Sequence, residues 1–277
     1  MDFYELAKIE NEAERVNKTY DIFNEDTRLN HSKAARVEFL TTVHYIEKYL
    51  KEGDRILDIG AGAGEYSLYF SRCGYEVSAL ELADANIAAF RKKITAKDKI
   101  DLVQGNALDL SRYKDNAFDI VLLFGPLYHL QSHEDKLKCI HEARRVCRDN
   151  GKIFFSFISN DFVFLTELEY DANYFLTGDY DKDTFRLNDF PFVFHTVDTA
   201  RQLLIEGGVT LLHEVASDGA SELMAARINE MDEENYTQYL RYHLYICEKP
   251  ELLGMSNHLL FVGENKDHSD NEITVKR

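Results

Sequence analysis

The most constraining stretch of the chain runs from Arg55 to Leu68 and reads RILDIGAGAGEYSL. Its first residues are apolar, as in a buried β-strand, and glycines follow at the alternate positions Gly60, Gly62 and Gly64. Glycine has no Cβ and accepts positive φ, so it lets the backbone bend sharply and approach a ligand closely. The residues after the loop begin a helix, whose amino end presents unpaired amides and a partial positive charge. The sequence therefore predicts a strand–turn–helix unit that suits a nucleotide-like cofactor, and a tight turn without a ligand is the alternative.

Strand and helix patterns alternate on both sides of this unit. Strands are predicted at 55–59, 76–80, 100–104, 118–124, 152–158, 209–215 and 258–263. Helical patterns occur at 32–50, 65–72, 84–93, 132–148, 196–205 and 217–249. Strands that are apolar on both faces and alternate with helices predict a parallel sheet covered on both sides. We therefore expect an α/β fold: a doubly wound, mostly parallel, seven-stranded Rossmann-like sheet with helices on both faces.

Two flanks depart from this pattern. Residues 1–32 contain a loosely helical acidic segment, and residues 159–195 are rich in Phe, Tyr and Asp without a clear period. A long stretch without regular structure inside a domain is more often a functional lid than a plain connector. We expect one domain over residues 1–277, with a core at 33–158 and 196–264. The lid would come from the amino-terminal helices and the insertion before the sixth strand.

Charge and composition limit the classes of function. The 277-residue chain has a formal net charge of −17, which argues against nucleic acid as a partner, because such proteins present a basic surface to phosphates. No apolar run approaches the roughly 18 residues that span a bilayer, and the acidic start lacks a secretory signal pattern. The four cysteines form neither a C-x-x-C pair nor a zinc-site spacing. We expect a cytoplasmic monomer or homodimer with no metal centre and no membrane partner.

The spacing of the glycine loop distinguishes between cofactors. The dinucleotide fingerprint is G-x-G-x-x-G, and Glu65 stands here at the position of its third glycine. A nicotinamide oxidoreductase is therefore disfavoured. Glu81 follows Gly60 by 21 residues, at the carboxyl end of the second predicted strand. A carboxylate at this place can accept both hydroxyls of a ribose, and a solvated glutamate at a strand end is the alternative.

This loop, with Asp58 before it, resembles motif I of the class I S-adenosylmethionine-dependent methyltransferases. The likeness continues in order and spacing through Glu81, Asn106–Ala107, Tyr128–His129 and the segment 145–151, and it covers residues 53–158. Three further segments are similar to a bacterial branch of the family that methylates small molecules. They are GPLYHL at 125–130, FHT at 194–196 and LLGMSNHLL at 252–260.

The resemblance implies S-adenosylmethionine as cofactor and S-adenosylhomocysteine as product. It places the methionine part at Asp58 and the glycine loop, the ribose at Glu81 and the adenine at Asn106, where a turn-forming asparagine is the alternative. Arg28 is a further candidate, for the methionine carboxylate, with a surface arginine as the alternative. The residues expected to bind the cofactor, besides Arg28, are Asp58, Gly60, Ala61, Gly62, Gly64, Glu81, Leu82, Asn106, Ala107, Phe124 and Gly125.

Methyl transfer needs a base only where the acceptor must lose a proton. The candidates are His129 and His195, because the ordinary pKa of histidine lies near neutrality; substrate orientation or helix capping is the alternative for each. Tyr20, Tyr128 and Phe194 are candidate walls for the acceptor. The expected partner is a small, partly apolar methyl acceptor. A methyltransferase acting on RNA or protein and a non-catalytic cofactor-binding protein of the same fold stay open as alternatives.

Overall fold

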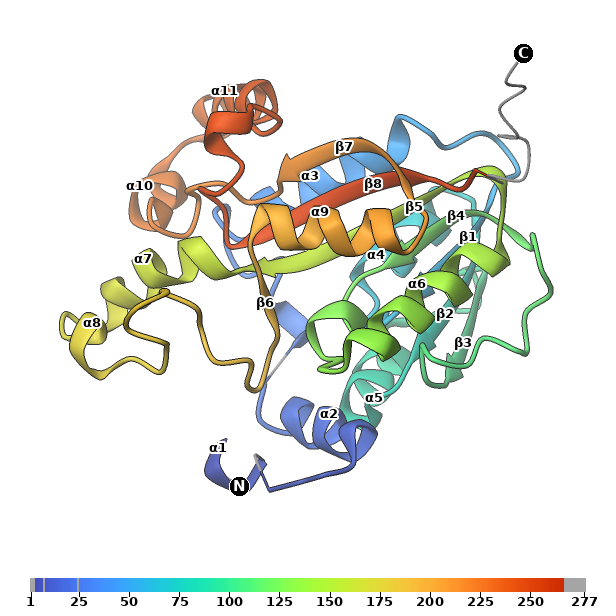
Figure 1. Ribbon diagram of the computed structural model, residues 1–277. Helices are drawn as coiled ribbons and strands as arrows, with labels where there is room; N and C mark the ends of the chain where they lie inside the picture. The colour runs from blue at the N-terminus through green and yellow to red at the C-terminus, as the bar shows by residue number, and fades with distance from the viewer. Residues whose placement is uncertain (1–2, 7, 24, 267–277) are drawn as a thin grey trace, which may run out of the picture.

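The computed structural model describes residues 3–6, 8–23 and 25–266 (Figure 1). Its centre is one sheet in the order β3–β2–β1–β4–β5–β8–β7, in which β1 to β5 run parallel and β8 runs antiparallel to both of its neighbours. A short β6 pairs with the end of β5. The predicted doubly wound, mostly parallel sheet is confirmed, with β6 as an additional strand. The strands are β1 (Arg55–Ile59), β2 (Glu76–Glu81), β3 (Ile100–Gln104), β4 (Phe118–Leu123), β5 (Cys147–Ser159), β6 (Phe194–His195), β7 (Thr210–Ala216) and β8 (His258–Glu264).

Helices connect the strands. The α-helices are α1 (Phe3–Leu6), α2 (Glu12–Tyr20), α3 (Arg36–Glu47), α4 (Glu65–Arg72), α5 (Asp84–Lys93), α6 (His133–Val146), α7 (Asn160–Tyr170), α8 (Tyr174–Thr177), α9 (Val197–Glu206), α10 (Ala225–Glu230) and α11 (Glu233–Ile246). Short 3₁₀ helices are η1 (Glu25–Thr27), η2 (Pro126–Tyr128) and η3 (Pro250–Leu252). Ser132 caps α6, since its hydroxyl accepts a hydrogen bond from the N–H of Asp135. Such a cap satisfies one amide that the first helical turn leaves unpaired.

The two faces of the sheet enter two separate apolar cores. On one face, Leu57 and Val121 pack with α6 and α9; on the other, Ile56 and Ile120 pack with α3 and α4. Figure 1 shows α6 and α9 in front of the sheet and α3 and α4 behind it. Successive strand residues point to opposite faces, so a sheet covered on both sides needs strands that are apolar throughout. This explains the continuous apolar runs in the sequence.

The insertion at 159–195 is more regular than the sequence suggests, because its first part forms α7 and α8. Ser159 caps α7 by accepting hydrogen bonds from the N–H groups of Asp161 and Phe162. Phe162 is buried, whereas Val163 and Glu167 line a cavity. Other apolar residues of α7, Leu165 and Leu168, are 37% and 40% exposed. The apolar side chains of α7 thus lie on buried and exposed sides alike, and the helix lacks the single apolar stripe by which an amphipathic helix is recognised.

The helical pattern at 217–249 is divided in the structure. Residues 217–224 form turns, and α10 and α11 follow. Asp232 separates the two helices and caps α11, since its carboxylate accepts a hydrogen bond from the N–H of Asn235 at 2.8 Å. The local capping preference of Asp thus interrupts a pattern that reads as one helix.

Within residues 3–6, 8–23 and 25–266, no helix combines the length and the apolar character that crossing a membrane requires.

Candidate active site

A cavity opens at the carboxyl ends of β1, β2 and β4, and residues of α2 and of the segment 25–29 form its opposite wall. In open α/β sheets, ligands bind at the carboxyl ends of the parallel strands. We call this space the strand-end cavity. Its lining includes most of the predicted site residues: Tyr20, Arg28, Asp58, Gly60, Ala61, Gly62, Glu81, Leu82, Asn106, Ala107, Phe124, Gly125, Tyr128 and His129.

Two glycines of the loop shape this cavity. Gly60 has a φ of +78°, and a Cβ there would lie 2.5 Å from the carbonyl oxygen of Phe124 and 2.7 Å from Cδ of Pro126. Gly62 has a φ of +54°, and a Cβ there would meet nothing within 4 Å. Gly60 therefore lets the loop pack directly on the end of β4. Gly62 leaves open space beside the main chain, where a ligand fits.

Gly64, which the resemblance assigns to the cofactor, is absent from the lining of the strand-end cavity. A Cβ at Gly64 would lie 2.2 Å from the ring of Phe90 on α5. Gly64 thus serves the packing of α4 against α5, and only the first two glycines of the motif face the cavity.

Glu81 ends β2 and is 4% exposed. Its carboxylate accepts hydrogen bonds from the N–H of Gly62 at 2.7 Å and the N–H of Ala83 at 2.8 Å. Burial raises the pKa of this carboxyl above its ordinary value, and the two N–H donors oppose that shift. The side-chain amide of Asn86 donates a third, longer hydrogen bond at 3.4 Å. A carboxylate has about four acceptor positions, so Glu81 ties the loop to β2 and keeps the capacity to accept a ribose hydroxyl.

Asp58 is buried in β1 and accepts a hydrogen bond from the hydroxyl of Ser67 at 2.6 Å. It therefore holds the loop through the following helix α4. Burial raises the pKa of Asp58 to about 7; the Ser67 hydrogen bond opposes the shift and the nearby Glu81 adds to it. A cationic group in the cavity would favour the ionised form. This environment suits a contact with an ammonium group.

Asn106 takes part in the turn that follows β3. Its side-chain oxygen accepts a hydrogen bond from the N–H of Leu108 at 2.9 Å. The turn-forming role is therefore observed. An amide oxygen has a second lone pair, and Asn106 and Ala107 both line the strand-end cavity, so the turn is compatible with a contact to adenine.

Tyr20 and His129 meet at the wall of the strand-end cavity. The Tyr20 hydroxyl lies 2.7 Å from Nε2 of His129, and the His129 ring also packs on Tyr128 and Phe192. Burial lowers the pKa of His129 to about 3, and Arg15 acts in the same direction. His129 is therefore a neutral imidazole with a low affinity for protons. Its environment favours the orienting role over the base.

His195 is not brought to the strand-end cavity. It lies in β6 beside Phe194, which lines a different cavity, and neighbouring strand residues point to opposite sides. The His195 ring packs edge-on against Phe157, with the ring centroids 5.0 Å apart. In the described part of the chain neither of its ring nitrogens has a hydrogen-bond partner, and burial lowers its pKa to about 3. Its surroundings are those of a core histidine.

Arg28 lines the strand-end cavity, but two carboxylates already engage its guanidinium. Its two terminal nitrogens donate to Glu38 at 2.7 and 3.2 Å, and Nε donates to Glu25 at 3.0 Å. This two-pronged pairing matches the planar fork of arginine. Arg28 could bind the carboxylate of a cofactor only by exchanging one of these partners.

A second cavity of about 570 Å³ adjoins the first, and Glu25, Arg28 and Tyr128 line both. We call it the flank cavity, because most of its other walls come from residues 158–194 and from the chain around residues 222 and 257–258. Its volume lies within the range of about 300–1,000 Å³ that is typical of small-molecule sites. Its aromatic walls are Phe23, Tyr128, Tyr174, Phe190, Phe192 and Phe194.

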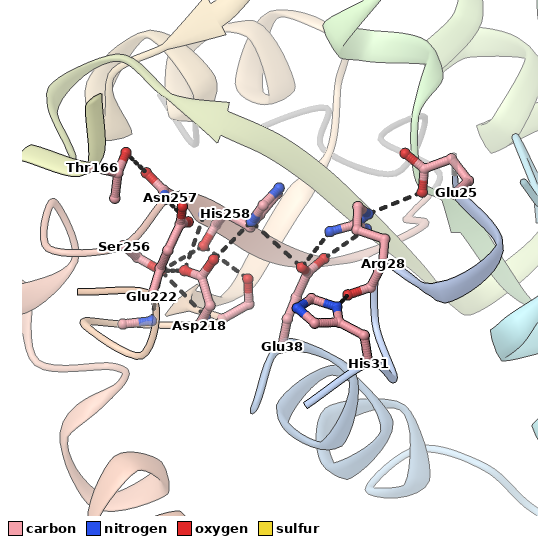
Figure 2. A network of polar contacts seen from close by, with 12 residues as sticks. Glu25, Arg28, His31, Glu38, Thr166, Asp218, Glu222, Ser256, Asn257 and His258 are labelled. Atoms are coloured by element: carbon pink, nitrogen blue, oxygen red, sulfur yellow. Dashed lines mark hydrogen bonds and ion pairs between the residues drawn. The ribbon is translucent and has the colours of Figure 1, made fainter. Parts of the chain in front are cut away.

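A polar network that sequence reasoning missed runs beside the flank cavity (Figure 2). It extends from Arg28 through Glu38 to His258 and Asp218. His258 begins β8, and β8 is antiparallel, so its first residue lies at the same edge of the sheet as the carboxyl ends of the parallel strands. The predicted last strand does begin at this histidine. Its direction depends on its pairing with β5, which no local pattern encodes.

Comparison with known proteins agrees with this geometry. Residues 57–155 match the family model described as a methyltransferase domain. The demethylmenaquinone methyltransferase of Clavibacter sepedonicus is 30% identical over 120 residues, which are 43% of this chain and 47% of that protein. The 27-O-demethylrifamycin SV methyltransferase of Amycolatopsis mediterranei is 30% identical over 110 residues, 38% of this chain and 38% of that protein. The chain thus spans less than half the length of these relatives.

The fold has counterparts over almost the whole chain. The magnesium protoporphyrin IX methyltransferase of Synechocystis PCC 6803, solved with bound S-adenosylhomocysteine, has a TM-score of 0.56 and 12% sequence identity. The match covers 93% of this chain and 100% of that one. The fold, the glycine loop and the family match all point to the same family. The chain therefore carries, over residues 57–155, a domain of the class I S-adenosylmethionine-dependent methyltransferase family.

Proposed function

We propose that this chain transfers the methyl group of S-adenosylmethionine to a small-molecule acceptor. The observation that carries the proposal is the junction of two cavities, which share Glu25, Arg28 and Tyr128. Group transfer requires donor and acceptor to be held in contact. A strand-end cavity with a carboxylate for a ribose, next to an aromatic cavity of small-molecule size, supports such an arrangement.

The donor set of the strand-end cavity fits this cofactor. When bound, it would supply an activated methyl group and a good leaving group. Glu81 would accept the ribose hydroxyls, and Asn106 and Ala107 would contact the adenine. Asp58, with the main-chain carbonyls near Phe124, would hold the ammonium. The chain itself would contribute position and exclusion of water.

A small acceptor is supported by the size and the apolar walls of the flank cavity. The net charge of −17 argues against an RNA acceptor, since phosphates require a basic surface. The two relatives named above act on demethylmenaquinone and on 27-O-demethylrifamycin SV, according to their names. A cytoplasmic location is part of the proposal and is supported by the free Cys73, Cys139, Cys147 and Cys247. A monomer or homodimer is the proposed assembly.

The test compares Glu81→Gln with Glu76→Gln at the other, exposed end of the same strand. Binding of S-adenosylhomocysteine to the full chain is measured by calorimetry. A hydrogen bond to a charged group contributes about 1.5–3 kcal/mol, so we expect Glu81→Gln to weaken binding about 10- to 150-fold. Glu76→Gln should bind like the unmodified chain. No binding by the unmodified chain, or equal affinity of the two variants, would contradict the proposal.

A further inference from the structure

His258 is a titratable residue of the flank cavity to which neither the sequence motifs nor the family match gives a role. Its side chain is 22% exposed and lies at the carboxyl edge of the parallel strands. Arg28 and Tyr128, which line the same cavity, also line the strand-end cavity. A base acting on a methyl acceptor would have to stand near this junction, because the acceptor meets the cofactor there.

Two carboxylates hold one ring nitrogen of His258. Nδ1 lies 2.7 Å from Oδ2 of Asp218 and 3.4 Å from Oε2 of Glu38. An ionised carboxylate only accepts hydrogen bonds, so Nδ1 carries the proton. Figure 2 shows the other ring nitrogen, Nε2, pointing away from both carboxylates, and it makes no hydrogen bond within the described residues. The lone pair of the neutral imidazole is therefore on Nε2.

Other donors fix the two carboxylates. Asp218 accepts hydrogen bonds from the hydroxyl of Ser256 and from the backbone N–H of His258. Glu38 accepts two from Arg28. Ligand atoms of Glu38, Asp218 and His258 lie within 4.8 Å of one another, a spacing that could hold a metal ion. Because protein donors already occupy these carboxylate oxygens, we interpret the group as a hydrogen-bonded triad.

We propose that His258 is the general base for the methyl acceptor, and that the acceptor presents an aromatic hydroxyl to Nε2. This inference rests on the proposed function. The hydroxyl proton passes to Nε2, and the oxygen forms its new bond to the methyl carbon. The bond from that carbon to sulfur breaks, and its electron pair stays on the sulfur. Asp218 and Glu38 are positioning residues, because they orient the ring and stabilise the imidazolium that forms.

The charges around His258 favour uptake of this proton. Burial alone lowers the pKa of His258, but Glu38 on α3 and Asp218 after β7 outweigh it and hold the pKa above its ordinary value, while Arg28 opposes them. Glu167 and Glu222 add negative charge at other walls of the flank cavity. His258 thus differs from the two histidines that the sequence suggested, since burial lowers the pKa of both of those.

The walls of the flank cavity indicate the acceptor's chemistry. Tyr174, Phe190, Phe192 and Phe194 present rings that pack well against another aromatic ring, edge to face or offset. An aromatic hydroxyl has a pKa of about 10, as in tyrosine. Its proton can therefore pass to a well-placed imidazole during the transfer step, whereas an aliphatic hydroxyl is a much weaker acid.

The activity test uses the full chain with S-adenosylmethionine and, separately, tyramine, catechol and 4-hydroxybenzoate, with S-adenosylhomocysteine formation as readout. We expect His258→Gln to lower kcat about 10²- to 10⁴-fold, to leave the affinity for S-adenosylhomocysteine within twofold, and to lose the acid limb of the pH–rate profile. Exogenous imidazole should partly restore His258→Ala, which a purely structural role would not allow. The matched control is His213→Gln. His213 lies on β7 outside both cavities, and its Nδ1 pairs with Glu248 at 2.8 Å. This variant should keep full activity.

A second readout does not depend on turnover. In NMR spectra of the chain with ¹⁵N-labelled histidine, we expect neutral His258 to be protonated on Nδ1, and Asp218→Asn to lower its pKa. In the activity assay, Asp218→Asn should move the acid limb of the pH–rate profile to lower pH. This shift tests the base role even if His258→Gln fails to bind S-adenosylhomocysteine. The base role would be overturned if neutral His258 carried its proton on Nε2. It would also be overturned if Asp218→Asn changed neither the pKa of His258 nor the position of the acid limb.

The remaining outcomes separate the two proposals. A chain that does not bind S-adenosylhomocysteine overturns the proposed function and this inference with it. A chain that binds it but methylates none of the three aromatic hydroxyls overturns the aromatic-hydroxyl acceptor alone. Full activity of His258→Gln overturns the base role and leaves the proposed function in place.

Discussion

The strand-end cavity and the flank cavity adjoin each other, but the chain builds them in different ways. Much of the strand-end cavity consists of loops that directly follow β1, β2, β3 and β4, and part of its surface is main chain of the glycine loop. The flank cavity is made of side chains from segments far apart in the sequence, among them residues 23, 25, 28, 158–194, 222 and 257–258. A cofactor shared by many enzymes can be bound by local backbone geometry. An acceptor specific to one enzyme is recognised by side chains that tertiary packing brings together.

The comparison extends to the two histidines at the cavities. His129 lies in the strand-end cavity with Tyr20 on its Nε2 and a pKa lowered to about 3 by burial. His258 lies in the flank cavity with carboxylates on its Nδ1 and a pKa held above its ordinary value. The residue type is the same, so the surroundings decide which of them can take up a proton near neutral pH. Four further predictions probe the difference between the two cavities.

The largest expected effect is on the backbone of the glycine loop. Gly60→Ala places a Cβ against Phe124 and Pro126 at a positive φ. We expect it to lower the free energy of unfolding by roughly 4–5 kcal/mol, from left-handed strain and overpacking together, and to abolish binding of S-adenosylhomocysteine. Urea unfolding and calorimetry measure the two effects.

The control is Gly74→Ala, where φ is +104° and a Cβ would meet nothing within 4 Å. Its cost should be the left-handed strain alone, roughly 1–2 kcal/mol, with binding unchanged. Equal losses for the two variants would show that φ, and not the close approach to β4, makes Gly60 necessary.

The same difference explains what the sequence could predict. Gly60, Glu81 and Asn106 each lie directly after a strand, so their meeting at one edge follows from a parallel sheet. Most predicted cofactor residues do line the strand-end cavity. Gly64 does not, because its contact with Phe90 depends on how α4 and α5 pack, which alternate spacing of glycines does not reveal.

The flank cavity is much harder to predict from the sequence. The sequence predicts both Phe194 and His195 at the site, but neighbours on a strand point to opposite sides, and Phe194 is the one that lines a cavity. The outer members of the triad of Glu38, Asp218 and His258 lie 220 positions apart in the sequence. It forms only when α3, the end of β7 and the start of β8 come together, and no local spacing encodes that meeting.

The second prediction concerns Asp58, whose folded-state pKa of about 7 lies above its unfolded value. The folded state then binds the proton more tightly, so the stabilisation is present at low pH and is lost as pH rises from about 4 to about 7. Asp58→Asn keeps an acceptor for Ser67 and should remove this loss. At pH 8 we expect the variant without cofactor to be more stable than the unmodified chain by roughly 3–4 kcal/mol.

Urea unfolding at pH 5 and pH 8 measures this effect as a difference between the two proteins. Asp101→Asn is the control, because its carboxylate is 63% exposed. It should give a curve parallel to that of the unmodified chain. A parallel curve for Asp58→Asn would falsify the assignment of a raised pKa to Asp58.

The third prediction tests the acceptor side alone. Phe192 lines the flank cavity and packs on Tyr128 and His129, with centroid distances of 6.2 and 5.3 Å. Loss of one aromatic contact costs about 0.5–1.5 kcal/mol beyond the buried area. Phe192→Ala should therefore raise KM for a phenol that serves as methyl acceptor roughly tenfold and leave S-adenosylhomocysteine affinity unchanged. Phe185→Ala, at a 53% exposed ring outside both cavities, should alter neither quantity. An effect of Phe192→Ala on the cofactor alone would mean that the two cavities are not functionally distinct.

The smallest expected effect distinguishes the two interpretations of Arg28. If its guanidinium binds the methionine carboxylate, loss of a charge-assisted contact of about 1.5–3 kcal/mol would weaken S-adenosylhomocysteine binding more than tenfold. If it stays with Glu25 and Glu38, as the hydrogen bonds have it, Arg28→Gln should change that affinity less than threefold. We expect the second result, together with a modest loss of stability, because Glu38 would lose its bidentate partner.

Glu38 also faces Nδ1 of His258 at 3.4 Å, and a Glu38 freed from Arg28 should hold the imidazolium more strongly. The acid limb of the pH–rate profile should therefore move to higher pH in Arg28→Gln. Such a shift would show that Arg28, which lines both cavities, influences the base His258 through Glu38, the carboxylate that both side chains contact.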